Sequence, residues 1–151
     1  MDKLLDIFIG TIKWIIGIFF GRISNKNVPI KVKIFKLPND STWFFNKYPY
    51  KIEIYLNNQT AKSFYIDSIQ LVLSKHQFDV MEFGTILNDT TPRSPLRPVC
   101  VQPNEAKPIE GIIEIGYGFD FEKQMKEAKP KLMLKIGKKT LKYNIELEKV
   151  S

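Results

Sequence analysis

Apolar and polar side chains alternate with a two-residue period through most of the chain after Asn27. Successive side chains of a β-strand point to opposite faces of the sheet, so this period predicts strands that bury one face. Segments with this pattern are residues 30–34, 50–56, 64–73, 109–115 and 132–147, with shorter candidates at 78–83 and 98–102. Within 64–73 we expect the register to shift near Asp67 and Ser68. The alternation therefore predicts antiparallel β-structure for most of the chain.

Turn-forming residues separate these segments. The stretch "LPNDS" forms one turn and "NNQTAKS" a second, and Gly137, Lys138 and Lys139 form the turn of a C-terminal hairpin. Proline cannot donate a backbone hydrogen bond to a ladder, so the proline-rich stretch 87–108 is predicted as loop and sheet edge. One helix is expected in "DFEKQMKEA", where Asp120 caps the first turn.

These signals predict an all-β fold, a two-layer antiparallel sandwich of seven or eight strands with one short, late helix. The 151 residues divide into an apolar segment at 1–24 and a sandwich domain at 28–151. Apolar residues make up 44% of the chain and charged residues 26%, a balance that argues against bulk disorder.

Residues 4–23 form an apolar run that, as a helix, would span about 30 Å, the hydrocarbon thickness of a bilayer. The polar and small residues of this run recur at spacings of three and four and therefore share one narrow stripe. The members of this helix-association stripe are Asp6, Gly10, Lys13, Gly17 and Gly21. Gly17 and Gly21 match the small-xxx-small pattern by which membrane helices pack closely. We therefore expect the helix to pair with itself or with a membrane partner along this stripe.

Three environments compete for this helix: the bilayer interior, the membrane interface and a soluble oligomer. Its apolar side chains outweigh the cost of one lysine on insertion scales, and its polar stripe is narrow for an interfacial helix, so a spanning anchor is favoured. A secretory signal peptide is disfavoured because "FFGRISNK" offers no small-x-small cleavage pattern. Basic residues follow the helix rather than precede it. This asymmetry predicts a single-pass membrane protein whose C-terminal domain is cytoplasmic, and the single cysteine, Cys100, agrees.

The net charge is +7, and the basic excess has two sources. One group follows the apolar run: Arg22, Lys26, Lys31, Lys33 and Lys36. An anionic leaflet attracts such residues, so this group is predicted to hold the domain against the membrane surface. The second group lies near the C-terminus: Lys129, Lys131, Lys135, Lys138, Lys139 and Lys142. No aromatic residues interleave with it, so nucleic-acid binding is disfavoured.

The stretch "STWFFNKYPY" concentrates aromatic side chains in ten residues. Most of them are expected in the core. Those that stay exposed, with Trp43, Phe44 and Phe45 as candidates, are expected at a partner or membrane interface, where amphipathic rings are enriched.

Patterns of catalysis and metal binding are missing from the sequence. One histidine, His76, and one cysteine are too few for a metal site built from these ligands. Glu110 and Glu114 alternate on one strand face and suggest a carboxylate pair, although a solvated face is the favoured interpretation. Neither a phosphate loop nor a nucleophile elbow occurs. We therefore expect no enzymatic activity and no cofactor.

The stretch "YKIEIYLNNQTAKSFYIDSIQLVL" resembles a pattern of Ig-like sandwich domains in bacterial proteins. In these domains a strand ends in Asn, a polar turn follows, and the next strand carries Ile-x-x-Ile before its apolar run. The matching residues here are Asn57, Asn58, Ile66, Ile69 and Leu71. The later "VQPNEAKPIEG" resembles the Pro-x-Glu turn that opens a following strand. The resemblance spans about residues 48–150, implies a membrane-anchored Ig-like domain, and carries no catalytic residues.

The function predicted from these features is a non-enzymatic, membrane-tethered cytoplasmic module that recruits or recognises a protein partner. An alternative makes the helix the effector: several copies assemble through the Lys13 stripe and perturb the membrane, with the sandwich as sensor or platform. In a third interpretation the helix docks on a soluble partner. Replacement of Lys13 by Leu separates the first two, because only an assembly lined by this lysine depends on its charge.

Overall fold

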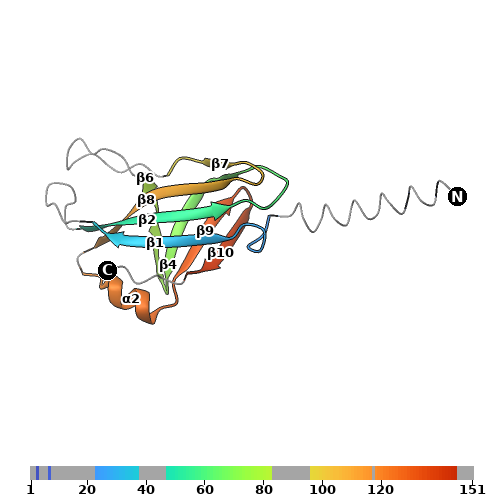
Figure 1. Ribbon diagram of the computed structural model, residues 1–151. Helices are drawn as coiled ribbons and strands as arrows, with labels where there is room; N and C mark the ends of the chain where they lie inside the picture. Colours follow the sequence, from blue (N-terminus) through green and yellow to red (C-terminus); the bar gives the residue numbers. More distant parts are fainter. Residues whose placement is uncertain are drawn as a thin grey trace.

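The computed structural model describes Lys3, Ile7 and residues 23–37, 47–82, 96–116 and 118–145, without the side chains of Lys47 and Tyr48. These residues include ten strand segments and the short helix α2 (Phe121–Glu127). Every strand pair among them is antiparallel. The described part of the chain is therefore mostly β-structure with a short late helix, as the alternation predicted (Figure 1).

Two four-stranded sheets form the body of the molecule. The first contains β1 (Ile30–Lys36), β2 (Lys47–Asn57), β8 (Ala106–Gly116) and β6 (Met81–Glu82), in the order β1-β2-β8-β6. The second contains β10 (Lys139–Asn144), β9 (Lys131–Ile136), β4 (Ser68–Leu73) and β5 (His76–Asp79), in the order β10-β9-β4-β5. A third sheet pairs β3 (Phe64–Ile66) with β7 (Val99–Val101).

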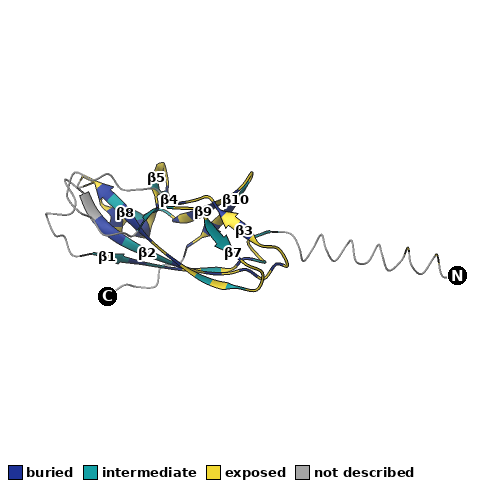
Figure 2. Ribbon diagram, turned by 90° about the horizontal axis from the view of Figure 1, so that it is seen from above, coloured by how far each residue is buried: buried dark blue, intermediate teal, exposed yellow. Residues whose placement is uncertain are grey.

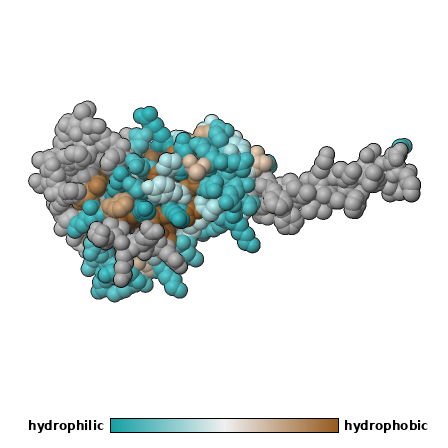
Figure 3. Space-filling view, in the orientation of Figure 1, coloured by the Kyte–Doolittle hydropathy of each residue, from teal (hydrophilic) through white to brown (hydrophobic). Residues whose placement is uncertain are grey.

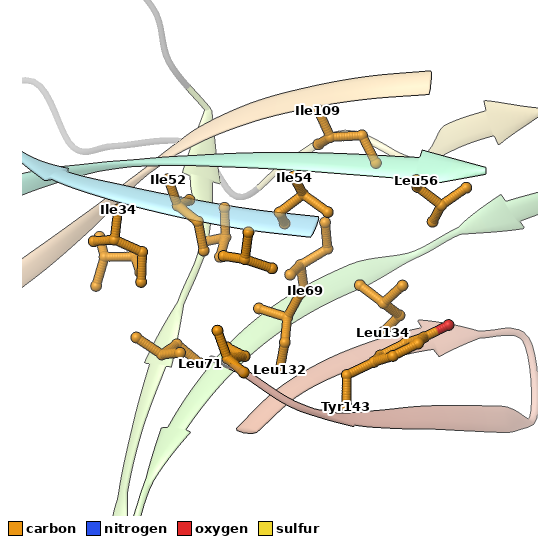
Figure 4. Packing of buried hydrophobic residues seen from close by; sticks show 14 of the residues in the cluster. Ile34, Ile52, Ile54, Leu56, Ile69, Leu71, Ile109, Leu132, Leu134 and Tyr143 are labelled. Carbon is orange, nitrogen blue, oxygen red and sulfur yellow. The ribbon is translucent and has the colours of Figure 1, made fainter. Parts of the chain in front are cut away.

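The hydrophobic core lies between the two four-stranded sheets. Ile52 and Ile54 of β2 point toward Leu71 of β4 and Leu132 of β9, and all four are buried (Figure 4). Figure 2 shows buried and more exposed residues alternating along several of the strands. Each aliphatic side chain of this size stabilises the fold by about 1.5–3 kcal/mol when it leaves water.

The register of the first sheet follows from the alternation. Val32 of β1 pairs with Ile54 of β2, and Ile34 pairs with Ile52, so the inner faces of both strands coincide. A shift by one residue would turn both apolar sets to solvent, which makes this register strongly preferred. The strands predicted at 30–34 and 50–56 are confirmed, and both extend beyond those bounds.

Two chain segments change sheets partway along their length. The segment 64–73 divides at Asp67, whose backbone N–H donates to Lys135 O at 2.7 Å, so the predicted shift near Asp67 is confirmed. The segment predicted as one strand at 78–83 divides at Val80, because β5 pairs in the second sheet and β6 in the first. That part of the prediction was wrong, since alternation within a segment carries no information about which sheet each half joins.

Local signals account for most of the connections. The Asp120 carboxylate accepts from the Lys123 N–H at 3.2 Å and caps α2, as predicted. The hairpin turn contains Gly137 and Lys138 only, because Lys139 already pairs with Ile136; the three-residue turn was wrong by one residue. The predicted loop also ends earlier than Pro108, since β8 begins at Ala106.

A buried polar centre joins the loop after β2 to the turn before β8. Asn58 and Thr60 are fully buried, and the Asn58 Oδ1 accepts from the Thr60 N–H at 3.0 Å and from the Thr60 hydroxyl at 2.6 Å. The Asn58 Nδ2 donates to Lys62 O at 2.8 Å and to Gln102 O at 3.0 Å. The polar turn predicted at "NNQTAKS" is therefore an ordered loop, with its buried amide fully hydrogen-bonded.

Candidate functional site

Many residues selected from the sequence lie outside the described residues. These are Asp6, Gly10, Lys13, Gly17 and Gly21 of the helix-association stripe, the basic residue Arg22, and the aromatic residues Trp43, Phe44 and Phe45. Lys3 and Ile7 are helical, and the Ile7 side chain is 67% exposed. In the described ranges, no helix has the length and hydropathy needed to cross a membrane.

The junction, residues 23–29, is the point at which the apolar run ends and the β-rich body begins. Ile23 packs against the core and Val28 is fully buried. The Lys139 ammonium donates to Ile23 O, and the Tyr143 hydroxyl donates to Val28 O at 2.6 Å. Since Lys139 and Tyr143 belong to β10, the junction is attached to the last described strand of the chain.

Further hydrogen bonds hold the junction from both sides. The Asn25 side-chain amide donates to Lys142 O on β10. On the other side, the Gln59 N–H donates to Asn27 O at 2.8 Å and the Asn57 N–H to Pro29 O at 3.0 Å. The junction is therefore held between β10 and the loop after β2. Its position relative to the body is set by directed hydrogen bonds in addition to apolar packing.

The lysines that follow the apolar run do not gather in one patch. Lys26 is exposed at the junction, whereas Lys31 and Lys33 lie on the outer face of the first sheet, opposite Tyr55 and Glu53. Lys36 ends β1, six positions after Ile30 and therefore about 20 Å from it. The strand conformation thus spreads a group that is compact in the sequence along the length of the body.

The outer face of the first sheet balances its charges. The Lys51 ammonium lies 3.2 Å from a Glu53 carboxylate oxygen and 3.6 Å from one of Glu110. The Tyr55 hydroxyl donates to Glu53 at 3.1 Å, and the Lys33 ammonium lies 5.8 Å from the centre of the Tyr55 ring. The hydrogen bond to Glu53 raises the pKa of the Lys51 ammonium, although desolvation opposes it. Glu110 therefore belongs to an ion-pair network on this face.

The outer face of the second sheet is basic. Lys131 and Lys135 of β9 are both exposed, as the sequence suggested, and Lys142 of β10 is exposed on the same face, where it pairs with Met133. The carboxylate described on this face, Asp79, accepts from the Gln70 amide at 2.8 Å. Hydrophilic side chains cover most of the described surface in the view of Figure 3.

Four lysines lie at or beside the junction, and we refer to them as the junction lysines: Lys26, Lys138, Lys139 and Lys142. The Lys139 ammonium donates to Ile23 O, and the Lys142 carbonyl oxygen accepts from the Asn25 side chain. Lys138 lies in the hairpin turn and directly precedes Lys139 in the chain. In the sequence they belong to two separate basic groups, one after the apolar run and one near the C-terminus. No local signal could have joined them, because Ile23 and Lys139 are 116 residues apart in the chain.

A second surface feature is an aromatic cluster near α2, away from the junction in Figure 1. The ring centroids of His76 and Phe119 lie 4.6 Å apart, and those of Phe78 and Phe119 lie 5.3 Å apart. His76 is exposed at the start of β5. Within the described residues, no three His, Cys, Asp or Glu side chains are grouped so that they could hold a metal ion.

Neither a protein-family model nor a curated protein sequence matches this chain.

Proposed function

We propose that the protein is a non-enzymatic, membrane-tethered module whose β-rich body lies in the cytoplasm and binds a protein partner. The observation that carries this proposal is the junction. An apolar run of bilayer length ends at Ile23, and the Lys139 ammonium and the Tyr143 hydroxyl bind the backbone just where the run ends. The exposed apolar side chain of Ile7 also supports a location outside the core of the body.

We propose further that the body is an Ig-like sandwich. The order β1-β2-β8 with β6 at its edge matches strands A, B, E and D of that fold, and β10-β9-β4 matches G, F and C. The buried disulfide of antibody domains has no counterpart, because Cys100 is the single cysteine. Proteins with this architecture have many unrelated functions, so the fold supports a binding role without naming the partner.

Membrane insertion is tested by alkaline carbonate extraction of membranes that contain the full chain. We expect the wild type to stay in the membrane pellet and the double variant Ile16→Glu/Phe19→Glu to be extracted, since each charge near a helix centre costs about 2.5–3.5 kcal/mol on insertion scales. Extraction of the wild type would contradict the tether and favour docking of the helix on a soluble partner.

Lys13→Leu is the matched control, because it removes the charge within the apolar run. A tethered module keeps both its membrane location and its partner after this change. If several copies instead assemble around Lys13 and perturb the membrane, the Lys13→Leu variant should no longer cause ion leakage from vesicles. Leakage caused by the wild type and abolished in Lys13→Leu would therefore replace the recruiting role with the alternative function.

Partner binding is tested by affinity purification of the full chain in mild detergent. If the stripe forms the helix contact, Gly17→Leu/Gly21→Leu will lose a membrane partner or a second copy, because leucine prevents close approach of the backbones. Ile12→Leu, which leaves the stripe unchanged, is the control. Identical recovery from all three proteins would show that the helix does not select the partner.

A further inference from the structure

The lysines best placed to meet a membrane surface come from the two ends of the chain. We propose that Lys26, Lys138 and Lys142 contact the anionic headgroups of the bilayer, so that the hairpin formed by β9 and β10 lies against the membrane. This inference rests on the proposed function, because it requires the apolar run to be inserted. It keeps Lys26 from the surface predicted from the sequence and replaces the lysines of β1 with Lys138 and Lys142.

Chain connectivity supplies the first argument. If the apolar run is inserted, its last residue, Ile23, lies at the boundary between hydrocarbon and headgroups. Ile23 is tied to β10 through its carbonyl oxygen, which accepts from the Lys139 ammonium, and two residues later Asn25 donates to Lys142 O. Lys26, Lys138 and Lys142 are exposed and lie next to these contacts, so the insertion of the run brings them to headgroup depth.

Charge supplies the second argument. Of the carboxylates near the junction, Glu105 lies 3.6 Å from the Lys107 ammonium. Asp67 accepts from the Gly137 N–H at 2.9 Å, which fixes its position and leaves one negative charge beside the three exposed lysines. No ion pair within the described ranges joins a junction lysine to a carboxylate. Positive charges without an acidic partner on one surface are attracted by anionic lipids.

Two lysines of β1, Lys33 and Lys36, are less well placed to meet the membrane. Lys33 lies over the Tyr55 ring beside Glu53, within the balanced network of the first sheet. Lys36 is at the opposite end of β1, about 20 Å from Ile30, which exceeds the Debye length of about 8 Å at physiological salt. These lysines serve as internal controls in the same molecule.

Lysine acetylation footprinting of the full chain in vesicles tests the proposal residue by residue. In phosphatidylserine-containing vesicles, the acetylation rates of Lys26, Lys138 and Lys142 should fall about fivefold relative to pure phosphatidylcholine vesicles. The rates at Lys36 and at Lys123 on α2 should stay unchanged. Raising the salt to 1 M should restore the rates at the protected lysines, because the attraction is screened.

Two results would overturn the inference. One is equal acetylation at all lysines in both vesicle types, and the other is protection of Lys33 and Lys36 in place of the hairpin lysines. Carbonate extraction of the same samples separates this failure from failure of the tether. A chain that stays in the pellet without lysine protection refutes the surface, whereas an extracted chain refutes the insertion on which it rests.

Charge-reversal variants complete the test. Lys138→Glu/Lys142→Glu should abolish the difference in Lys26 acetylation between the two vesicle types, whereas Lys33→Glu/Lys36→Glu should leave it at about fivefold. Loss of the difference in both variants would overturn the assignment. So would protection of the junction lysines by a single-stranded oligonucleotide without protection by anionic vesicles, which would make nucleic acid the ligand.

Discussion

At the residue scale, Asn58 has the most demanding environment in the described structure. Its side chain is fully buried and makes hydrogen bonds to Thr60, Lys62 and Gln102, in two different loops. A buried amide is stabilising only when its donors and acceptors are matched, and it costs free energy when a partner is removed. The same amide that marks the resemblance to Ig-like domains thus has a structural role.

Asn58→Ala should lower the free energy of unfolding by about 2 kcal/mol, because the Thr60 N–H loses its acceptor and the Lys62 and Gln102 carbonyl groups each lose one of two donors. Asn57→Ala is the matched control. Asn57 is exposed, and the substitution keeps its backbone hydrogen bond to Pro29, so the change should stay within about 0.5 kcal/mol. Urea denaturation in mild detergent measures both, and equal losses would contradict the role of the buried amide.

At the element scale, two hairpins use the same backbone conformation with different residues. Ser74 follows Leu73, which pairs with His76, and Gly137 follows Ile136, which pairs with Lys139. Both have positive φ, +57° at Ser74 and +59° at Gly137. A side chain in this region is strained, so the first hairpin accepts a cost that the second avoids.

Ser74→Gly and Gly137→Ala should therefore change stability in opposite directions. Gly137→Ala should destabilise by about 1 kcal/mol through the backbone alone, because no atom lies within 4 Å of the added Cβ. Ser74→Gly should stabilise the fold by about 0.5 kcal/mol, because the backbone strain that it relieves exceeds the extra conformational entropy that glycine loses on folding. Midpoints of urea denaturation report the sign, and a shift of both in the same direction would refute the shared turn geometry.

Gly111 lets the segment containing Val80 cross from the second sheet to the first. A Cβ at this position would lie 2.2 Å from the Val80 Cγ1 and 2.9 Å from Met81 O. We expect Gly111→Ala to destabilise by about 2 kcal/mol through overpacking. Gly116→Ala, in the same strand with no atom within 4 Å of the added Cβ, should be neutral or slightly stabilising. Thermal denaturation compares them, and similar midpoints would show that the crossing can move.

At the scale of the whole molecule, the two ends of the described body are joined. The Tyr143 hydroxyl donates to Val28 O across 115 residues of sequence, and both residues are buried. Burial raises the pKa of Tyr143 well above its ordinary value of 10. The Tyr143 hydroxyl therefore stays protonated in the folded state at pH 10, where a tyrosine in water is half ionised.

Tyr143→Phe should cost about 1 kcal/mol at pH 7, since Val28 O loses its donor. The pKa is raised by folding, so this tyrosine contributes its full stability below pH 10 and loses it as the pH rises further, where the unfolded chain ionises and the folded chain does not. The stability difference between wild type and Tyr143→Phe should shrink above pH 10. Urea denaturation at pH 7, 9 and 11 measures it, and a constant difference would contradict the buried donor.

Features that depend on neighbours in the chain were predictable from the sequence. The alternation placed the strands at 30–34 and 50–56, and Asp120 marked the start of α2, because side-chain direction and capping are local properties. The break at Asp67 was also visible as a fault in the alternation.

The tertiary structure decided which strands are neighbours and which charges meet. The division at Val80 and the contact between Ile23 and Lys139 join residues whose proximity depends on the packing of two sheets. The energy that selects this packing is the burial of apolar faces from distant segments, and no window of the sequence contains both faces. The sequence by itself thus determined the strands and their inner faces, and only the fold determined that the junction lies against β10.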